Sequence, residues 1–147
     1  MVLPHTVTVY NVATVTDKTT FDETTVNYMT VLSGVLLDAT KGSNVRASGL
    51  VNADSVTLHI PMGLVGIDAQ TGAEKTYVEP MVFWAAEDKT DKWTLSTDEN
   101  TFFVKGNVVE ADKSYEYISM AHSDVYNVTK VDVKDFGGLA HLEVGGV

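Results

Sequence analysis

The stretch HTVTVYNV at residues 5–12 indicates the fold class of this chain. Val7 and Val9 fall on one side of an extended backbone, and the threonines and Tyr10 fall on the other, because successive side chains of a strand point to opposite faces. This alternation predicts a β-strand over His5–Val12. The same chemistry continues along the 147 residues, since 23 Val, 18 Thr and 3 Ile give a share of β-branched side chains that favours pleated sheets over helices.

Outward from this stretch, alternating apolar residues and the turn residues between them predict further strands. These strands are expected at Thr25–Asp38 with a bulge or bend at Gly34, Asp54–Ile60, Trp93–Ser96, Thr101–Lys105, Tyr115–Met120, Val125–Val133 and Leu139–Val144. Tyr115–Met120 stays open between a strand and a helical turn. A hairpin is expected over Leu64–Val78 with its tip at Asp68–Gly72, and Pro80–Glu87 predicts a short helix because proline suits the first helical position.

Many short strands with little helix are typical of an antiparallel β-sandwich or barrel. Neither a shift in composition nor an internal repeat divides the chain. We therefore expect a single all-β domain over residues 1–147, with long loops and one or two short helices.

Composition excludes several classes of function. Twenty acidic and ten basic residues give a net charge of -10, and Arg46 is the one arginine, so we expect no cationic surface for nucleic acid or anionic membranes. The absence of cysteine excludes disulfides, thiolate metal sites and cysteine nucleophiles. The apolar runs are far shorter than the roughly 20 residues of a bilayer helix, and the N-terminus lacks the pattern of a secretory signal. We expect a soluble protein that is not exported.

A search for catalytic and metal-binding motifs finds none. The four histidines, His5, His59, His122 and His141, include no pair at the i,i+2 or i,i+4 spacing that places two imidazoles on one face. The acidic clusters lie mostly in predicted turns, where carboxylates cap backbone amides. Neither a nucleophile elbow nor a phosphate-binding glycine motif is present. We expect no metal, no cofactor and no enzymatic activity.

Long loops and aromatic residues supply the candidates for partner binding. Thr14–Thr25 is predicted as a solvated connection or a long hairpin tip, and we expect partners to order the loops Thr40–Asn52 and Met62–Tyr77. The Arg46 guanidinium either pairs with a neighbouring subunit's carboxylate or stays solvated in a turn. The aromatic residues Trp84, Phe83 and Trp93 have three possible roles: they pack in the core, they form a platform that stacks on sugars, or they anchor an interface. The candidate partner-binding residues are Arg46, Asp68, Thr71, Gly72, Phe83 and Trp84.

Several strings of the chain resemble a family of small structural proteins of tailed bacteriophages, described as minor capsid proteins of the head-to-tail region. The strings are LPHTVTVYN at residues 3–11, TVLSGV at 30–35, NVRASGL at 44–50, ADSVTLHIP at 53–61, DFGG at 135–138 and HLEVGG at 141–146. The resemblance runs in order along nearly the whole chain. It implies a part of the virion and not an enzyme.

By analogy with small all-β proteins of the phage neck, the resemblance implies a head-completion or stopper-type subunit of the head-tail connector ring. Its expected partners are copies of itself and the portal, adaptor and tail proteins of the same phage. DNA would only pass through the lumen, since acidic walls repel phosphates, and no membrane is involved. The expected location is the virion neck, after synthesis in the host bacterial cytoplasm. The alternative function is a carbohydrate- or ligand-binding β-sandwich that stacks Trp84 and Trp93 on a sugar.

Overall fold

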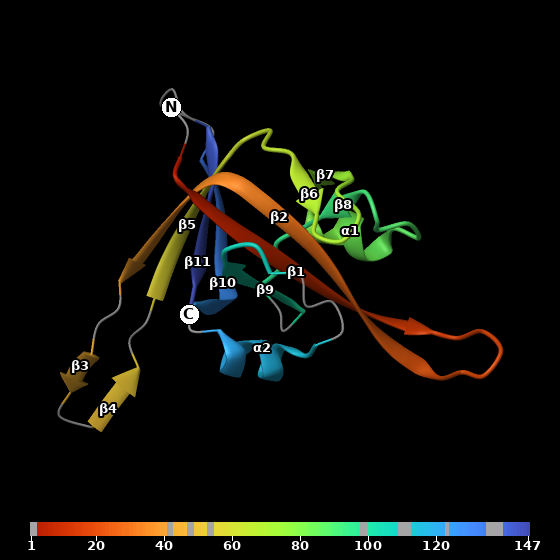
Figure 1. Ribbon diagram of the computed structural model, residues 1–147, viewed down its shortest axis with the longest axis horizontal. Helices are drawn as coiled ribbons and strands as arrows, with labels where there is room; N and C mark the ends of the chain where they lie inside the picture. Colours follow the sequence, from red (N-terminus) through yellow and green to blue (C-terminus); the bar gives the residue numbers. More distant parts are fainter. Residues whose placement is uncertain are drawn as a thin grey trace.

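The computed structural model describes residues 3–40, 43–46, 49–52, 55–97, 100–108, 113–122, 124–134 and 140–147. For the residues of these ranges that lie between 39 and 52, it describes the backbone but not the side chains. In this part of the chain eleven strands and two helices form (Figure 1). In chain order they are β1 (His5–Thr16), β2 (Glu23–Thr40), β3 (Ser43–Arg46), β4 (Gly49–Asn52), β5 (Ser55–Pro61), β6 (Gly66–Asp68), β7 (Glu74–Tyr77), α1 (Pro80–Ala85), β8 (Lys92–Trp93), β9 (Thr101–Lys105), α2 (Tyr115–Ala121), β10 (Val125–Lys134) and β11 (His141–Gly146). None of the helices in the described ranges has the length and apolar character needed to cross a bilayer.

Six strands close into an antiparallel barrel. Their order is β1-β2-β5-β11-β10-β9, and β9 pairs back onto β1. The all-β prediction is confirmed, and closure decides for a barrel over a sandwich. Strands β6, β7 and β8 form a small side sheet that continues from the edge of β2 opposite β1, and β7 and β8 run parallel in it (Figure 1).

The longest strand, β2, bends at Gly34, where the sequence predicts a bulge. Thr6 of β1 pairs with Ser33 and His5 pairs with Val35, so Gly34 is the extra residue. Its φ of 87° lies in the left-handed region that favours glycine. The bend lets one strand contact β6 through its first half and β5 through its second half, which closes the barrel.

Two hydrophobic clusters lie on opposite sides of the barrel wall. The main cluster, which includes Val7, Val9, Leu32, Leu58, Ile60, Phe103 and Val144, holds the side chains of β1, β2, β5, β9, β10 and β11 that alternate into the barrel. The second cluster covers the opposite face of β1 and β9 and consists of Tyr10, Met29, Phe102, Val104, Val108 and Ile118. The alternation over residues 5–12 is therefore confirmed, and α2 buries the second face as well.

Residues 115–121 form the helix α2, so the strand interpretation of Tyr115–Met120 is wrong and the helical one is correct. The Ser114 hydroxyl accepts a hydrogen bond from the Tyr117 N–H at 3.3 Å, which caps the first turn. Ile118 is the buried residue of the helix, and its neighbours on both sides are exposed. A single apolar residue per turn fits a short helix on a surface and not a strand with one buried face.

Other predicted elements differ in length. β8 has two residues where Trp93–Ser96 was expected, because Asn11 bonds the backbone of Thr94 through both its amide nitrogen and its amide oxygen, at 2.9 and 3.2 Å. The expected excursion Thr40–Asn52 contains the hairpin β3–β4. Gly137 and Gly138, between the last two expected strands, lie outside the described residues.

Candidate functional site

The hairpin formed by β1 and β2 projects beyond the barrel, and residues 14–25 of this hairpin are here called the arm (Figure 1). Within the arm Thr14 pairs with Thr25 and Thr16 pairs with Glu23, and every arm residue is exposed. β9 pairs with β1 only up to Asn11, and β6 contacts β2 only from Thr30 onward. Among the described strands none pairs with the outer edges of the arm, so its backbone groups can accept another strand.

The tip of the arm is ordered by its own hydrogen bonds. The Asp17 carboxylate accepts the N–H of Thr19 at 2.7 Å, and the Asp17 carbonyl accepts the N–H of Phe21 at 2.8 Å. The loop closes through the Asp17 N–H, which donates to the Asp22 carbonyl at 2.9 Å. The bonds of Asp17 lower its pKa below the ordinary value, chiefly the backbone N–H of Thr19.

Phe21 at this tip combines two unusual properties. Its side chain is 78% exposed, and its φ of 60° makes it the only non-glycine residue with positive φ in the described ranges. A left-handed conformation costs a residue with a Cβ about 1–2 kcal/mol, and such strained conformations cluster at functional positions. An exposed aromatic ring on an ordered loop is the kind of residue that anchors protein interfaces.

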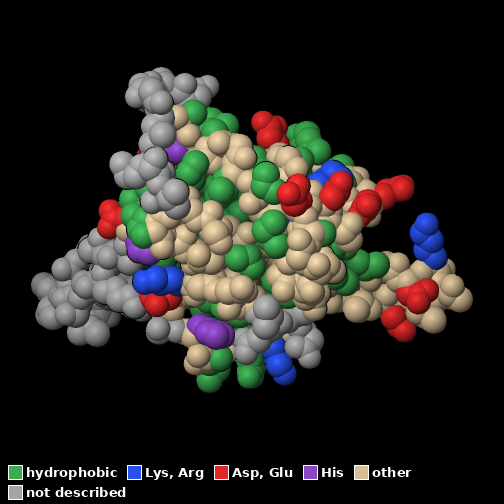
Figure 2. Space-filling view, turned by 45° about the horizontal axis from the view of Figure 1, so that its top comes forward, with side chains coloured by type: hydrophobic (Ala, Val, Ile, Leu, Met, Phe, Trp, Pro, Cys, Tyr) green, Lys and Arg blue, Asp and Glu red, His purple; other side chains and the backbone are tan. Residues whose placement is uncertain are grey.

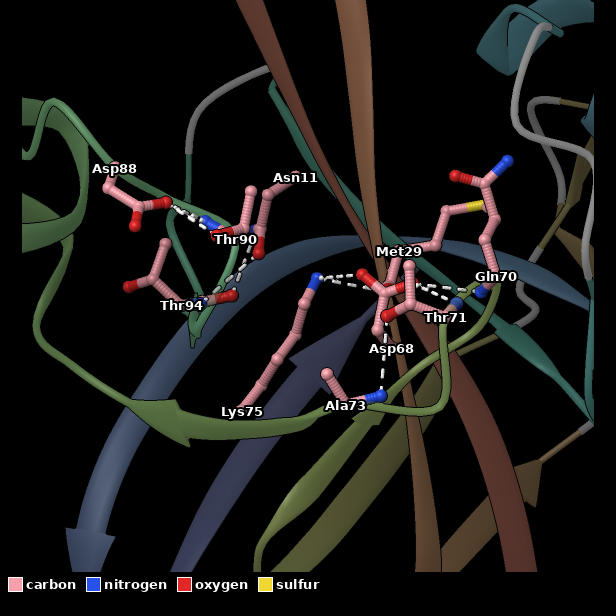
Figure 3. A network of polar contacts seen from close by, with 10 residues as sticks. All are labelled: Asn11, Met29, Asp68, Gln70, Thr71, Ala73, Lys75, Asp88, Thr90 and Thr94. Atoms are coloured by element: carbon pink, nitrogen blue, oxygen red, sulfur yellow. Dashed lines mark hydrogen bonds and ion pairs between the residues drawn. The ribbon is translucent and has the colours of Figure 1, made fainter.

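The hairpin tip predicted at Asp68–Gly72 is confirmed, and its residues act mainly within the fold. The Asp68 carboxylate accepts the N–H groups of Gln70 and Thr71 at 2.8 and 2.9 Å (Figure 3). Gly72 has a φ of 75° and donates its N–H to the Asp68 carbonyl at 3.0 Å. Gln70, Thr71 and Gly72 are exposed, so they are the residues of this turn that a partner can reach.

Asp68 also forms an ion pair with Lys75, whose side chain is completely buried. The Lys75 Nζ lies 3.1 Å from the Asp68 carboxylate and donates to the Met29 carbonyl at 3.1 Å (Figure 3). Burial raises the pKa of Asp68, but the N–H groups of Thr71 and Gln70 and the Lys75 ammonium together lower that pKa below its ordinary value. The ion pair therefore ties the turn between β6 and β7 to β2 of the barrel.

Asp68 and Thr71 also line an open hollow of about 510 Å³ between this turn, β2 and the loop before β8. Glu74 and Asp91 contribute two further carboxylates to its wall. Figure 2 shows acidic side chains spread over one face of the molecule, with apolar side chains reaching the surface between them. Asp68 and Asp91 already pair with Lys75 and Lys92, at 3.1 and 2.7 Å, so much of the negative charge at this hollow is balanced within the chain.

The aromatic candidates do not form a binding platform. Phe83 is 0% exposed and packs edge-on against Tyr28 and Trp84, so it offers no surface to a partner. Trp93 is 1% exposed and belongs to the core, which removes one of the two rings that the sugar-stacking alternative requires. Trp84 is partly buried. Arg46 ends β3, and its side chain lies outside the described part of the structure.

Two of the four histidines come together, although their spacing in the sequence predicts isolation. The rings of His59 on β5 and His141 on β11 lie 5.4 Å apart between centroids. His5 accepts the Leu37 N–H at 2.9 Å through Nδ1, and His122 ends α2. For Thr14–Thr25 the hairpin alternative is confirmed, since β1 pairs with β2 out to Thr16 and Glu23. The proximity of His59 and His141 was not predicted, because the two residues are far apart in the sequence.

Comparisons with curated proteins and with solved structures find no match. A family model, described as a family of unknown function (DUF6751), matches residues 2–147, which is nearly the whole chain. The chain, a closed β-barrel with a projecting arm, therefore belongs to this family.

Proposed function

We propose that this chain is a non-enzymatic structural protein of a tailed-phage virion, a head-completion or stopper-type subunit that assembles into a ring at the neck between head and tail. It acts through contacts with copies of itself and with the portal, adaptor and tail proteins. The resemblance of its sequence to phage structural proteins supports the virion assignment. The arm supports the mode of action.

The observation that carries the proposal is the exposed, ordered Phe21 at the end of the arm. Barrel closure pairs the strands of the body, so among the described strands the unpaired backbone edges lie on the arm, the side sheet and the β3–β4 hairpin. An arm that binds a different surface on the next copy makes a head-to-tail contact, and such contacts generate rings when the rotation closes. Figure 1 shows β3–β4 reaching away from the barrel on the side opposite the arm, which gives each copy two projections.

The net charge of -10 fits a ring around DNA. An acidic lumen repels phosphates, so a duplex can slide through it without being held. DNA is therefore a passing cargo and not a ligand in this proposal, and the partner surfaces are protein.

Assembly of tag-free protein tests the proposal, measured by light scattering after size-exclusion chromatography and by negative-stain microscopy. Burying one Phe ring stabilises a contact by about 1.5–3 kcal/mol, which is about a ten- to hundredfold change in the association constant. Phe21→Ser should therefore weaken ring assembly by that factor without lowering the melting temperature of the monomer. Met120→Ser is the matched control, because Met120 is 89% exposed on α2, away from the arm.

Assembly that depends on Phe21 and survives Met120→Ser supports a ring built through the arm. A wild-type chain that stays monomeric in solution and is absent from the neck of the intact particle contradicts the proposed function. Equal assembly of the wild-type and Phe21→Ser proteins contradicts the role of the arm. Arg46→Ala in the same assay tests the predicted contact of the one arginine.

A further inference from the structure

The pairing of β5 with β11 places three potential metal ligands on one patch of the outer barrel wall. Glu143 pairs directly with His59, and His141 lies two residues before Glu143 on the same face of β11. The side chains between them, Leu142 on β11 and its cross-strand partner Ile60 on β5, belong to the core. The register of two hydrogen-bonded strands therefore fixes the relative positions of the three groups.

The geometry suits a small cation. The ligand atoms that His59, His141 and Glu143 can offer all lie within 4.8 Å of one another, and all three side chains are partly buried. Nε2 of His141 and the Glu143 carboxylate are 3.7 Å apart, beyond the roughly 2.7–3.2 Å of a hydrogen bond. Ligand bonds of about 2.0–2.1 Å around a tetrahedral zinc ion place the ligand atoms about 3.3 Å apart. Small rotations of these side chains would therefore bring the three ligand atoms to the spacing that a tetrahedral zinc ion requires.

The donor set selects the class of metal. Two imidazoles and one carboxylate suit Zn²⁺ and related divalent transition metals, whereas Mg²⁺ and Ca²⁺ prefer oxygen ligands alone. Three protein ligands leave one tetrahedral position open for water or for a group from another molecule.

The neighbouring strand β10 adds charges of both signs. Asp132 pairs with Glu143 in the register and binds the Lys130 ammonium at 2.9 Å, and Lys134 pairs with His141. The carboxylates of Asp132 and Glu143 raise the pKa of Lys130, so this ammonium already sits in the field that attracts a cation. Lys130 is 71% exposed and can turn away into solvent.

We propose that His59, His141 and Glu143 form a binding site for one divalent transition-metal ion, with Zn²⁺ as the representative ion. The site links β5 to β11 on the outside of the barrel. The inference rests on the strand register and the ligand set, and it is independent of the proposed ring assembly. It differs from the expectation of a metal-free protein, which depended on spacing along the sequence and not on spacing across a sheet.

The test is equilibrium dialysis and calorimetric titration of tag-free protein with ZnCl₂, followed by elemental analysis. We expect one Zn²⁺ per chain. His59→Gln, His141→Gln and Glu143→Gln should each weaken binding by more than the roughly 10–100-fold that follows loss of an outer-shell partner. His122→Gln removes a histidine at the end of α2 and should bind like the wild type. Lys130→Gln should bind more tightly, because a competing cation is removed.

Folding of each variant is checked without metal by its melting temperature, which these partly exposed side chains should change little. Added Zn²⁺ should raise the melting temperature of the wild type and of His122→Gln, and not that of His59→Gln. Less than stoichiometric binding by the wild type overturns the proposal. Binding that persists unchanged in His59→Gln, or that is lost equally in His122→Gln, also overturns it.

Discussion

Removing the two partners of the buried ion pair one at a time should destabilise the fold unequally. Asp68→Asn keeps an acceptor for the N–H groups of Gln70 and Thr71 but removes the charge that faces Lys75. Lys75 is 0% exposed, so its ammonium then remains buried with the Met29 carbonyl as its main partner. Breaking a buried pair in this way costs about 3–5 kcal/mol of the free energy of unfolding.

Lys75→Met should cost less. The remaining Asp68 side chain is 18% exposed and keeps the N–H groups of Gln70 and Thr71, so its charge retains hydrogen-bond donors and some contact with solvent. The Met29 carbonyl loses its lysine donor but keeps the Ala69 N–H at 3.3 Å, so the cost should stay near the lower end of the about 1–3 kcal/mol that a buried unsatisfied group costs. The double variant Asp68→Asn/Lys75→Met should be more stable than Asp68→Asn alone, because no uncompensated ammonium is left in the interior.

Urea unfolding at pH 7, followed by the fluorescence of the buried Trp93, measures these differences as midpoints at an unchanged slope. Lys92→Met is the matched control, since Lys92 pairs with Asp91 at 2.7 Å on the same side sheet but both side chains contact solvent. That exposed pair should contribute at most about 1 kcal/mol. If Lys75→Met destabilises the protein as much as Asp68→Asn, or if the double variant shows the sum of both losses, the reasoning is refuted.

Two further changes test other parts of the fold. Gly66→Ala should lower the free energy of unfolding by about 1–3 kcal/mol, because the added Cβ would collide with Cγ2 of Thr30. Chemical denaturation measures this loss, and an unchanged midpoint would contradict the packing of β6 against β2. Acid should destabilise the wild type as the pH falls below 3.8, the ordinary pKa of Asp68. The pKa of Asp68 is lower in the folded protein than in the unfolded chain, so its charged form stabilises the fold above pH 3.8, and this stabilisation is lost as the pH falls through the folded-state pKa. Asp68→Asn should show a shallower loss of stability below about pH 4 in the same titration, and an identical slope would contradict this contribution.

Local chemistry made several elements predictable from the sequence. The alternation at residues 5–12, the bulge at Gly34, the turn at Asp68–Gly72 and the helix that starts at Pro80 each depend on neighbours in the chain, and the structure confirms them. The strands of the arm lacked such a signal, because a ribbon that is exposed on both faces shows no period-2 alternation of apolar residues.

The features that the sequence could not predict depend on pairing between distant strands. Barrel closure requires β9 to pair with β1, for example Phe103 with Val9, and nothing local to either strand specifies this partner. His59 and His141 meet only because β11 lies beside β5 in one register, and a slip of one residue would point one of the imidazoles into the core. Likewise, Lys75 reaches the Met29 carbonyl only because β6 lies beside β2.

The net charge of -10 separates two ways in which copies of this chain can associate. Copies that carry this charge repel one another over the Debye length of about 10 Å at 0.1 M salt, so an interface has to overcome that repulsion. If Phe21 supplies the contact, Phe21→Ser weakens association by the same factor at low and at high salt, because an apolar ring carries no charge to screen. If Arg46 pairs with a neighbour's carboxylate, Arg46→Ala weakens association most at low salt and changes its salt dependence. Dissociation constants measured at two salt concentrations therefore assign the contact, and a Phe21→Ser loss confined to low salt would contradict an apolar role for the arm.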